Sequence, residues 1–435
     1  MRWFAGAILL LMAALALGFG LLAYAMYALL GVMIVSRLLT RLWAESLAAD
    51  RECNRVEAEV GDTVAVVIRV QNRGALPIPW VLLEDLLPLD AVASQPPRLG
   101  LVGSRLQLAT LRSRGNKTIL YQLRCRSRGY YQIGPLVLET GDLFGLHRRW
   151  RVVTEPHFLL VYPEVKPLEG YELASRRPIG EVRMSHRLYE DPTRIAGVRP
   201  YQSGDPLNRI HWRATARTGT LHSKVYEPST VAGATLLLDF HRAGYDPSHE
   251  PYRSELAVTM AASLANAVYL LGQQIGLVSN GRDAADRIRQ EGWAPDARTR
   301  REAQQSASML ERSERLEPLV VPTERGPEQF MRILETLARI ELTDGLSFAQ
   351  LVLETSSRLP HDATVVPLVS QVTPEAAVAL GNLRRRGLAV IALVNVYHLH
   401  DFEKAAGMLL DEGIDARHLA DEAAVTAICR EHALR

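Results

Sequence analysis

This chain of 435 residues has little net charge, few cysteines and no nucleotide-binding motif. Fifty Lys and Arg nearly balance 48 Asp and Glu, and the net charge of +2 is too small to favour nucleic acid as a partner. The chain has neither a P-loop nor a Gly-x-Gly-x-x-Gly motif, so no nucleotide cofactor is expected.

The three cysteines, Cys53, Cys125 and Cys429, lie far apart and include no Cys-x-x-Cys pair, which argues against structural zinc. Free thiols in a reducing compartment are the simpler interpretation. A Cys53–Cys125 bridge stays open if this region faces the outside of the cell.

The first stretch of the chain lacks charge altogether, from Trp3 to Ser36. A helix needs roughly 20 apolar residues to cross a bilayer core, so this run is long for one span and just sufficient for two short ones. The glycines of 18–20 predict a turn at its middle. Residues 1–36 are therefore expected to form a transmembrane hairpin.

That hairpin would place three arginines on one side of the membrane, namely Arg2, Arg37 and Arg41. The positive-inside rule then puts both ends and the rest of the chain in the cytoplasm, at the inner (plasma) membrane. A single tilted span with the N-terminus outside is the alternative. Residues 37–50 are expected to form a juxtamembrane helix with Trp43 near the headgroups.

Residues 51–161 alternate between apolar and polar side chains, which is typical of strands. Two faces stand out, made of Val64, Val66, Ile68 and Val70, and of Ile119, Tyr121, Leu123 and Cys125. Prolines between these strands argue against helices. We expect a small antiparallel β-sandwich. In Gly141-Asp142-Leu143-Phe144-Gly145-Leu146 the glycines are expected to make tight turns and the aromatic side chain to fill a core.

Residues 162–230 are expected to be a polar connector that contains the most distinctive segment of the chain, between Arg199 and Arg217. Asp205-Pro206 predicts a helix start, with Asp205 as N-cap, and Gly219 predicts its end. The signature and interaction candidates are Tyr201, Gly204, Asp205, Arg209, Ile210, Trp212, Ala216 and Arg217.

Three interpretations of this signature compete. It could be a structural clasp with Trp212 buried, a basic docking surface for an acidic partner, or a nucleic-acid patch. The clasp is favoured, and it predicts that Trp212→Ala destabilises the protein by roughly 3–5 kcal/mol. A nucleic-acid patch is disfavoured because interleaved aromatic side chains for base stacking are lacking.

In residues 231–435, apolar strands alternate with helices, which predicts a doubly wound, mainly parallel sheet. The expected strands are Thr235–Leu238, Gln274–Val278, Thr364–Val369 and Leu388–Val396, and the expected helices are Pro251–Leu271, Phe330–Ile340, Leu346–Arg358, Pro374–Arg386 and Phe402–Leu410. Ligands bind such sheets at the carboxyl ends of the strands, where Asp239 follows the first strand. His398 and His400 are interpreted as ordinary loop residues rather than metal ligands.

The spacing of the signature resembles that of the domain-of-unknown-function 58 family. The resemblance implies a von Willebrand factor type A-like α/β domain and an association with MoxR-type AAA+ ATPases. A metal site of that type would need serines two and four residues after Asp239, where this chain has His241 and Ala243, and an Asp near Ser370-Gln371. Asp239 is therefore a degenerate metal-site position. His211 stands where the family usually has Asp before the tryptophan.

Together these features predict a membrane-anchored, non-enzymatic adaptor or scaffold that works with a MoxR-type AAA+ ATPase, without cofactor or metal. The alternative is a metal-dependent von Willebrand A-type binding or adhesion domain that faces the cell exterior.

Overall fold

The computed structural model describes residues 2–168, 190–202, 210–228, 233–291, 317–360 and 363–428. The chain divides into two compact units. Unit 1 comprises Met1–Glu164, Arg282–Ser313 and Leu334–Glu341, and unit 2 comprises Val165–Gly281, Glu314–Ile333 and Leu342–Arg435.

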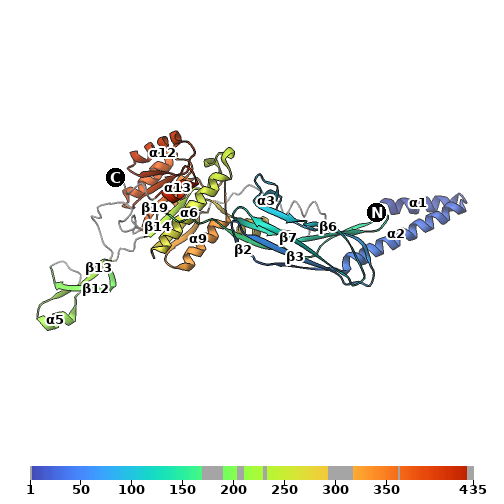
Figure 1. Ribbon diagram of the computed structural model, residues 1–435, viewed down its shortest axis with the longest axis horizontal. Coiled ribbons are helices and arrows are strands. Elements are labelled where there is room, and N and C mark those ends of the chain that lie inside the picture. Colours follow the sequence, from blue (N-terminus) through green and yellow to red (C-terminus); the bar gives the residue numbers. More distant parts are fainter. Residues whose placement is uncertain are drawn as a thin grey trace. The chain divides into compact units, whose positions relative to one another are not determined.

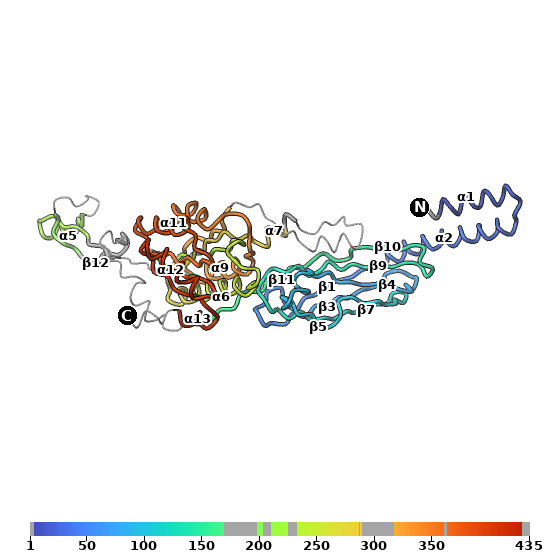
Figure 2. The backbone as a smooth tube through the Cα atoms, turned by 90° about the horizontal axis from the view of Figure 1, so that it is seen from above, coloured from blue at the N-terminus to red at the C-terminus, as the bar shows by residue number. Residues whose placement is uncertain are grey.

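Unit 1 begins with two antiparallel helices, α1 (Arg2–Ala16) and α2 (Gly20–Ser46), which lie side by side in both views (Figures 1 and 2). The chain turns at Gly18, whose φ of 72° favours glycine. The predicted turn at residues 18–20 is thus confirmed. By length and composition α2 can cross a membrane, whereas the apolar part of α1, Phe4–Ala16, is shorter. The chain therefore has an N-terminal apolar helix suited to a membrane anchor or a signal sequence.

The expected juxtamembrane helix of residues 37–50 is the continuation of α2, which runs without a break to Ser46, and strand β1 (Leu47–Cys53) follows at once. Residues 37–50 are therefore not a separate helix. Trp43 does not lie at an exposed headgroup position either. It is buried with Leu47 in the hydrophobic core of the β-rich region. The last turns of α2 are part of that core.

The β-rich region consists of short strands, as the alternating sequence predicts. They are β2 (Glu57–Glu59), β3 (Thr63–Asn72), β4 (Ile78–Asp85), β5 (Leu99–Gly103), β6 (Leu106–Leu111), β7 (Asn116–Cys125), β8 (Gly129–Ile133), β9 (Leu136–Gly141), β10 (Arg148–Val152) and β11 (His157–Tyr162), with a short helix α3 (Leu89–Ala93). Two antiparallel sheets have the orders β1-β3-β7-β5 and β10-β9-β4-β6, and β2-β11-β8 form a third.

The two four-stranded sheets share one core. Val64, Val66, Ile68 and Val70 of β3 are fully buried, and so are the predicted positions of β7. Val81 and Leu83 of β4 belong to the same cluster. Burying each of these side chains stabilises the fold by about 1.5–3 kcal/mol, so the alternation that predicts the strands also selects their inner face.

Unit 2 is built on a six-stranded mixed sheet with the order β17-β15-β14-β19-β20-β21. The strands are β14 (Gly233–Leu238), β15 (Gln274–Ser279), β17 (Leu319–Glu324), β19 (Ala363–Val369), β20 (Ile391–Val394) and β21 (Asp415–His418). All are parallel to their neighbours except β17, which pairs antiparallel with β15. Every residue of β14 is buried, which requires cover on both faces of the sheet.

Helices connect these strands much as the sequence predicts. They are α6 (Tyr252–Leu270), α9 (Pro327–Arg339), α10 (Phe348–Thr355), α11 (Pro374–Arg385), α12 (Leu399–Asp411) and α13 (Glu422–Ala427). Helix α11 begins after the cap Thr373 and is followed by Gly387 at φ 92°. The strand expected at Leu388–Val396 is shorter in the structure, where it is β20. The sequence analysis did not predict β17, β21 or α13.

Short elements also occur beyond the expected strands of the two units; of these, only helix α5 was predicted, through its end at Gly219. Unit 1 contains β16 (Arg282–Asp283), α7 (Ala284–Glu291) and β18 (Ile340–Glu341). The connector contains a hairpin of β12 (Glu190–Pro200) and β13 (His222–Pro228), with helix α5 (Trp212–Thr218) between its strands. We call β12, α5 and β13 the hairpin arm. The prediction of a polar connector therefore missed the two strands that make up much of its described part.

Candidate functional site

The carboxyl edge of the unit 2 sheet has a point at which the chain direction across the sheet reverses. Strands β14 and β19 are neighbours there. The chain leads from β14 to β15 on one side of this pair, and from β19 to β20 on the other. Open α/β sheets bind ligands in the crevice at such a switch point. Asp239 follows β14 and Ser370 follows β19, so both predicted positions meet at this edge.

Asp239 is buried, and its carboxylate is held by neighbours in its own unit. Its Oδ1 accepts hydrogen bonds from Asn280 Nδ2 at 3.0 Å and from the backbone N–H of His241 at 3.2 Å. Burial raises the pKa of Asp239, while the hydrogen bond from Asn280 acts in the opposite direction. Asp239 thus fixes the start of the following loop.

Residues 240–245 fold back over this edge. The Tyr245 hydroxyl donates to the carbonyl of Asp239 at 2.8 Å. A Cβ on Gly244 would lie 2.5 Å from Ser370 Oγ and 3.6 Å from Asp239 Oδ2, so a larger residue here would have to displace the Ser370 hydroxyl. Within the described part of the chain, the buried Ser370 hydroxyl has no hydrogen-bond partner. The loop itself therefore covers the switch point.

The residues present do not fit a magnesium site. A hard cation needs several oxygen ligands in octahedral array. His241 instead uses Nδ1 to accept from Ala243 N at 3.3 Å, and Ala243 has no side-chain oxygen. Among the described residues, no group of three or more His, Cys, Asp or Glu is placed to hold a metal ion. The degenerate position remains a single carboxylate beside amide and hydroxyl groups.

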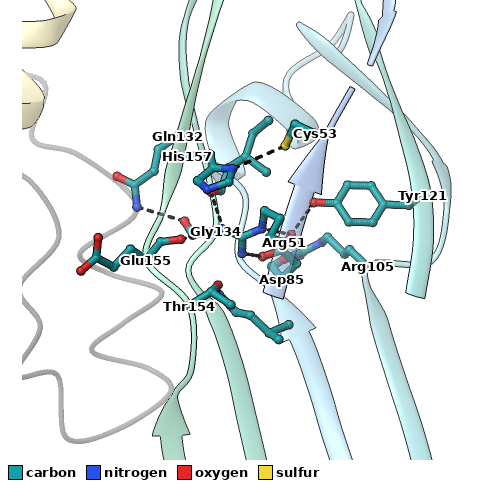
Figure 3. A network of polar contacts seen from close by, with 12 residues as sticks. Arg51, Cys53, Asp85, Arg105, Tyr121, Gln132, Gly134, Thr154, Glu155 and His157 are labelled. Carbon is teal, nitrogen blue, oxygen red and sulfur yellow. Dashed lines mark hydrogen bonds and ion pairs between the residues drawn. The ribbon is translucent and has the colours of Figure 1, made fainter. Parts of the chain in front are cut away.

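A second concentration of polar groups is buried in the sandwich (Figure 3). Arg51 and Asp85 form an ion pair whose side chains are 1% and 0% exposed. The Tyr121 hydroxyl donates to Asp85 Oδ2 at 2.5 Å, and Arg51 Nη1 donates to the carbonyl of Glu155 at 2.8 Å. Burial raises the pKa of Asp85, while the Arg51 charge and the Tyr121 hydrogen bond oppose that shift. Polar groups in this network satisfy one another.

Cys53 and His157 lie at the edge of this network, with Sγ and Nδ1 3.7 Å apart. A nucleophilic cysteine needs a lowered pKa. Here burial raises the pKa of Cys53 and lowers that of His157, so both groups favour their neutral forms. The pair therefore has the character of packed side chains rather than of an activated thiolate. Cys53 and Cys125 are free thiols, so the bridge left open above does not form.

The hairpin arm carries the described part of the signature. Ile210 is buried and pairs with Ser223, and His211 caps α5 by accepting from Ala214 N at 3.0 Å. Gly219 ends the helix at φ 71°, as predicted. Gly204, Asp205 and Arg209 lie outside the described residues, and with them the predicted cap at Asp205.

Trp212 is 68% exposed, so the expectation that it is buried in a clasp is wrong. Ala216 and Arg217 are also exposed, and Tyr201 is half-buried while its backbone N–H donates to the Leu221 carbonyl at 2.8 Å. The helical period placed Trp212 on a flank of α5, and the described residues leave that flank uncovered. Sequence reasoning also missed the pairing of β12 with β13.

These features define a protein with an N-terminal apolar helix, a β-sandwich, a mixed α/β sheet and an exposed signature helix. Residues 197–305 match the family model described as "Protein of unknown function DUF58". The chain is also 27% identical over 258 residues to "Uncharacterized protein YeaD" of Bacillus subtilis, a match that covers 59% of this chain and 62% of that protein. Both matches support the resemblance to the DUF58 family.

Two solved structures share weak similarity with parts of the chain. The CARDB domain of the PF1109 protein from Pyrococcus furiosus is 10% identical, with coverage of 26% of this chain and 91% of that one and a TM-score of 0.18. Proximal thread matrix protein 1 from the mussel byssus is 9% identical, with coverage of 46% of each chain and a TM-score of 0.30. Scores this low carry no argument about fold or function.

Proposed function

We propose that this protein is a membrane-anchored, non-enzymatic adaptor that docks a MoxR-type AAA+ ATPase through the hairpin arm. The observation that carries the proposal is the exposure of Trp212 on a helix that also presents Arg213 and Arg217 to solvent. Tryptophan and arginine are the residue types enriched at binding hot spots, and arginine favours an acidic partner surface.

The two chemical sites support a binding role over a catalytic one. Asp239 is buried under its own loop, and the Cys53–His157 pair favours neutral forms. The strand order of unit 2, with its reversal between β14 and β19, supports a doubly wound domain of the von Willebrand A-like type. In this proposal Asp239, the degenerate metal position, has a structural role, and the hairpin arm binds the partner.

Topology is the second part of the proposal. Helices α1 and α2 form a multi-pass hairpin in the inner (plasma) membrane, and everything after Arg37 faces the cytoplasm, where an AAA+ ATPase finds its nucleotide. Reporter fusions at the C-terminus test this side directly. An exterior C-terminus, combined with a thermal shift on adding magnesium or calcium, would favour the metal-dependent adhesion alternative.

Co-purification from membranes tests the partner. The full chain is captured with a nucleotide analogue that traps AAA+ ATPases, and a MoxR-type ATPase should be recovered. Trp212→Ala combined with Arg217→Glu should lose it. Leu270→Ala, which alters another exposed apolar side chain of unit 2, should retain it. If the ATPase is absent, or is recovered equally well with the double variant, the docking proposal fails.

A further inference from the structure

The turn between β9 and β10 exposes large apolar side chains that the sandwich core does not use. We call residues 142–147 the β9–β10 loop. Leu143 and Phe144 are 75% and 73% exposed, and Leu146 is exposed as well. The sequence predicts that Phe144 fills a core, and the structure contradicts this. Contiguous exposed apolar side chains of this kind mark contact with a partner or a membrane.

The loop holds its shape through bonds of its own. The Asp142 carboxylate accepts from the backbone N–H groups of Leu146 at 2.9 Å and His147 at 3.0 Å. Trp80 Nε1 donates to the Asp142 carbonyl at 3.3 Å. The apolar tip is therefore presented by a fixed turn, and its exposure is not a consequence of a loose segment.

The loop is also tied to the apolar helices. Ser36 Oγ of α2 donates to Asp142 Oδ2. The ring of Phe4 in α1 stacks on His147, with 6.5 Å between ring centroids. On β10, Arg151 Nη1 donates to the carbonyl of Ala44 near the end of α2 at 3.2 Å. All of these residues belong to unit 1. In Figure 2, β9 and β10 extend to the end of the sandwich next to α2.

Helix geometry gives the level at which the loop meets α2. Ser36 lies sixteen residues beyond Gly20, the first residue of α2. This corresponds to about 24 Å at the helical rise, against about 30 Å for a bilayer core. If the turn at Gly18 reaches the far side of that core, Leu143 and Phe144 lie where α2 leaves the near side.

Charge changes sharply at the same level. Exposed arginines follow the apolar part of α2 and the β9–β10 loop alike, namely Arg37, Arg41, Arg148 and Arg149. Apolar side chains bordered by basic ones are typical of surfaces that enter the boundary between headgroups and acyl chains.

We propose that the β9–β10 loop is a second membrane contact, in which Leu143 and Phe144 enter the interface of the leaflet beside α2. Arg148 and Arg149, which lie within 4.0 Å of Glu139 and Glu45 respectively, then lie at the level of the lipid phosphates. The inference rests on the proposed membrane anchoring by α1 and α2. Two separate contacts, the helices and this loop, would fix the sandwich in one orientation against the bilayer.

Depth-dependent quenching in vesicles tests this contact. The full chain, with its three native cysteines replaced by alanine, carries an environment-sensitive NBD probe on Phe144→Cys. The control probe is on Val56→Cys, a 56% exposed position before β2. Phosphatidylcholine–phosphatidylglycerol vesicles with bromine near the headgroups should quench the probe at position 144 several-fold more strongly than the probe at position 56.

Alkaline extraction separates the two proposals. If the chain stays in the membrane pellet and both probes are quenched equally weakly, the loop contact is overturned while the helical anchor stands. If alkali releases the chain, the anchor fails and the loop inference fails with it. A probe at position 144 that is shielded from aqueous iodide but not quenched by bromolipid would overturn the lipid assignment in favour of a protein cover.

Discussion

At the scale of single residues, the ion pair of Arg51 and Asp85 shows how a polar contact can hold a small sandwich together. Each side chain is almost wholly removed from water, and Tyr121 and backbone carbonyls satisfy further polar atoms. Breaking a buried pair leaves one uncompensated charge, which costs about 3–5 kcal/mol, whereas an exposed pair contributes about 0–1 kcal/mol.

We therefore expect Asp85→Ala to lower the free energy of unfolding of unit 1 by about 3–5 kcal/mol. Hydrogen exchange of β3 and β7 peptides during urea unfolding reports on this unit alone. Glu52→Ala is the matched control, because Glu52 pairs with Arg69 at a site where both side chains are 61% exposed. Equal effects of the two substitutions would show that the buried pair is not structural.

At the scale of elements, the side chains that are buried in the hairpin arm differ from those that its sequence predicts. Ile210 is buried between β13 and the start of α5, whereas Trp212 lies outside. The helical spacing of apolar residues gives the direction in which each side chain points from α5. It does not say whether another element covers that direction.

Accordingly, Trp212→Ala should change the stability of the arm by no more than about 0.5 kcal/mol, in contrast to the roughly 3–5 kcal/mol expected from the sequence. Ile210→Ala should cost about 2–5 kcal/mol. Amide protection of β12 and β13 in hydrogen exchange measures both. Loss of protection in the tryptophan variant would restore the clasp interpretation.

At the scale of the whole molecule, helix α2 and the sandwich form one folding unit. Trp43, near the end of α2, and Leu47, the first residue of β1, are members of the sandwich core. A domain boundary at residue 51 would cut through both the core and β1.

A chain that begins at Leu39 should therefore retain a folded sandwich, while one that begins at Arg51 should not. The shorter chain lacks the large core side chains of Trp43 and Leu47, each worth about 2–5 kcal/mol, in a domain whose total stability is about 5–15 kcal/mol. Dispersion of backbone amide signals in NMR spectra distinguishes the two. A well-folded chain starting at Arg51 would show that α2 contributes nothing to this core.

Local patterns determined much of this protein. Alternation set the inner faces of β3 and β7, because strand side chains point to opposite sides at every step. The uncharged run and Gly18 set the two helices and their turn. The position of Asp239 at a strand end followed from the order of strands and helices, because parallel strands end at one edge.

Only the tertiary structure decided what covers each of these elements. It placed Trp43 inside the sandwich, Trp212 in solvent, and the β9–β10 loop beside α2. It also closed the Asp239 edge with residues 240–245, where Gly244 approaches Ser370. A side chain's own neighbours along the chain fix its direction, but its burial depends on segments distant in sequence, and no local pattern records them.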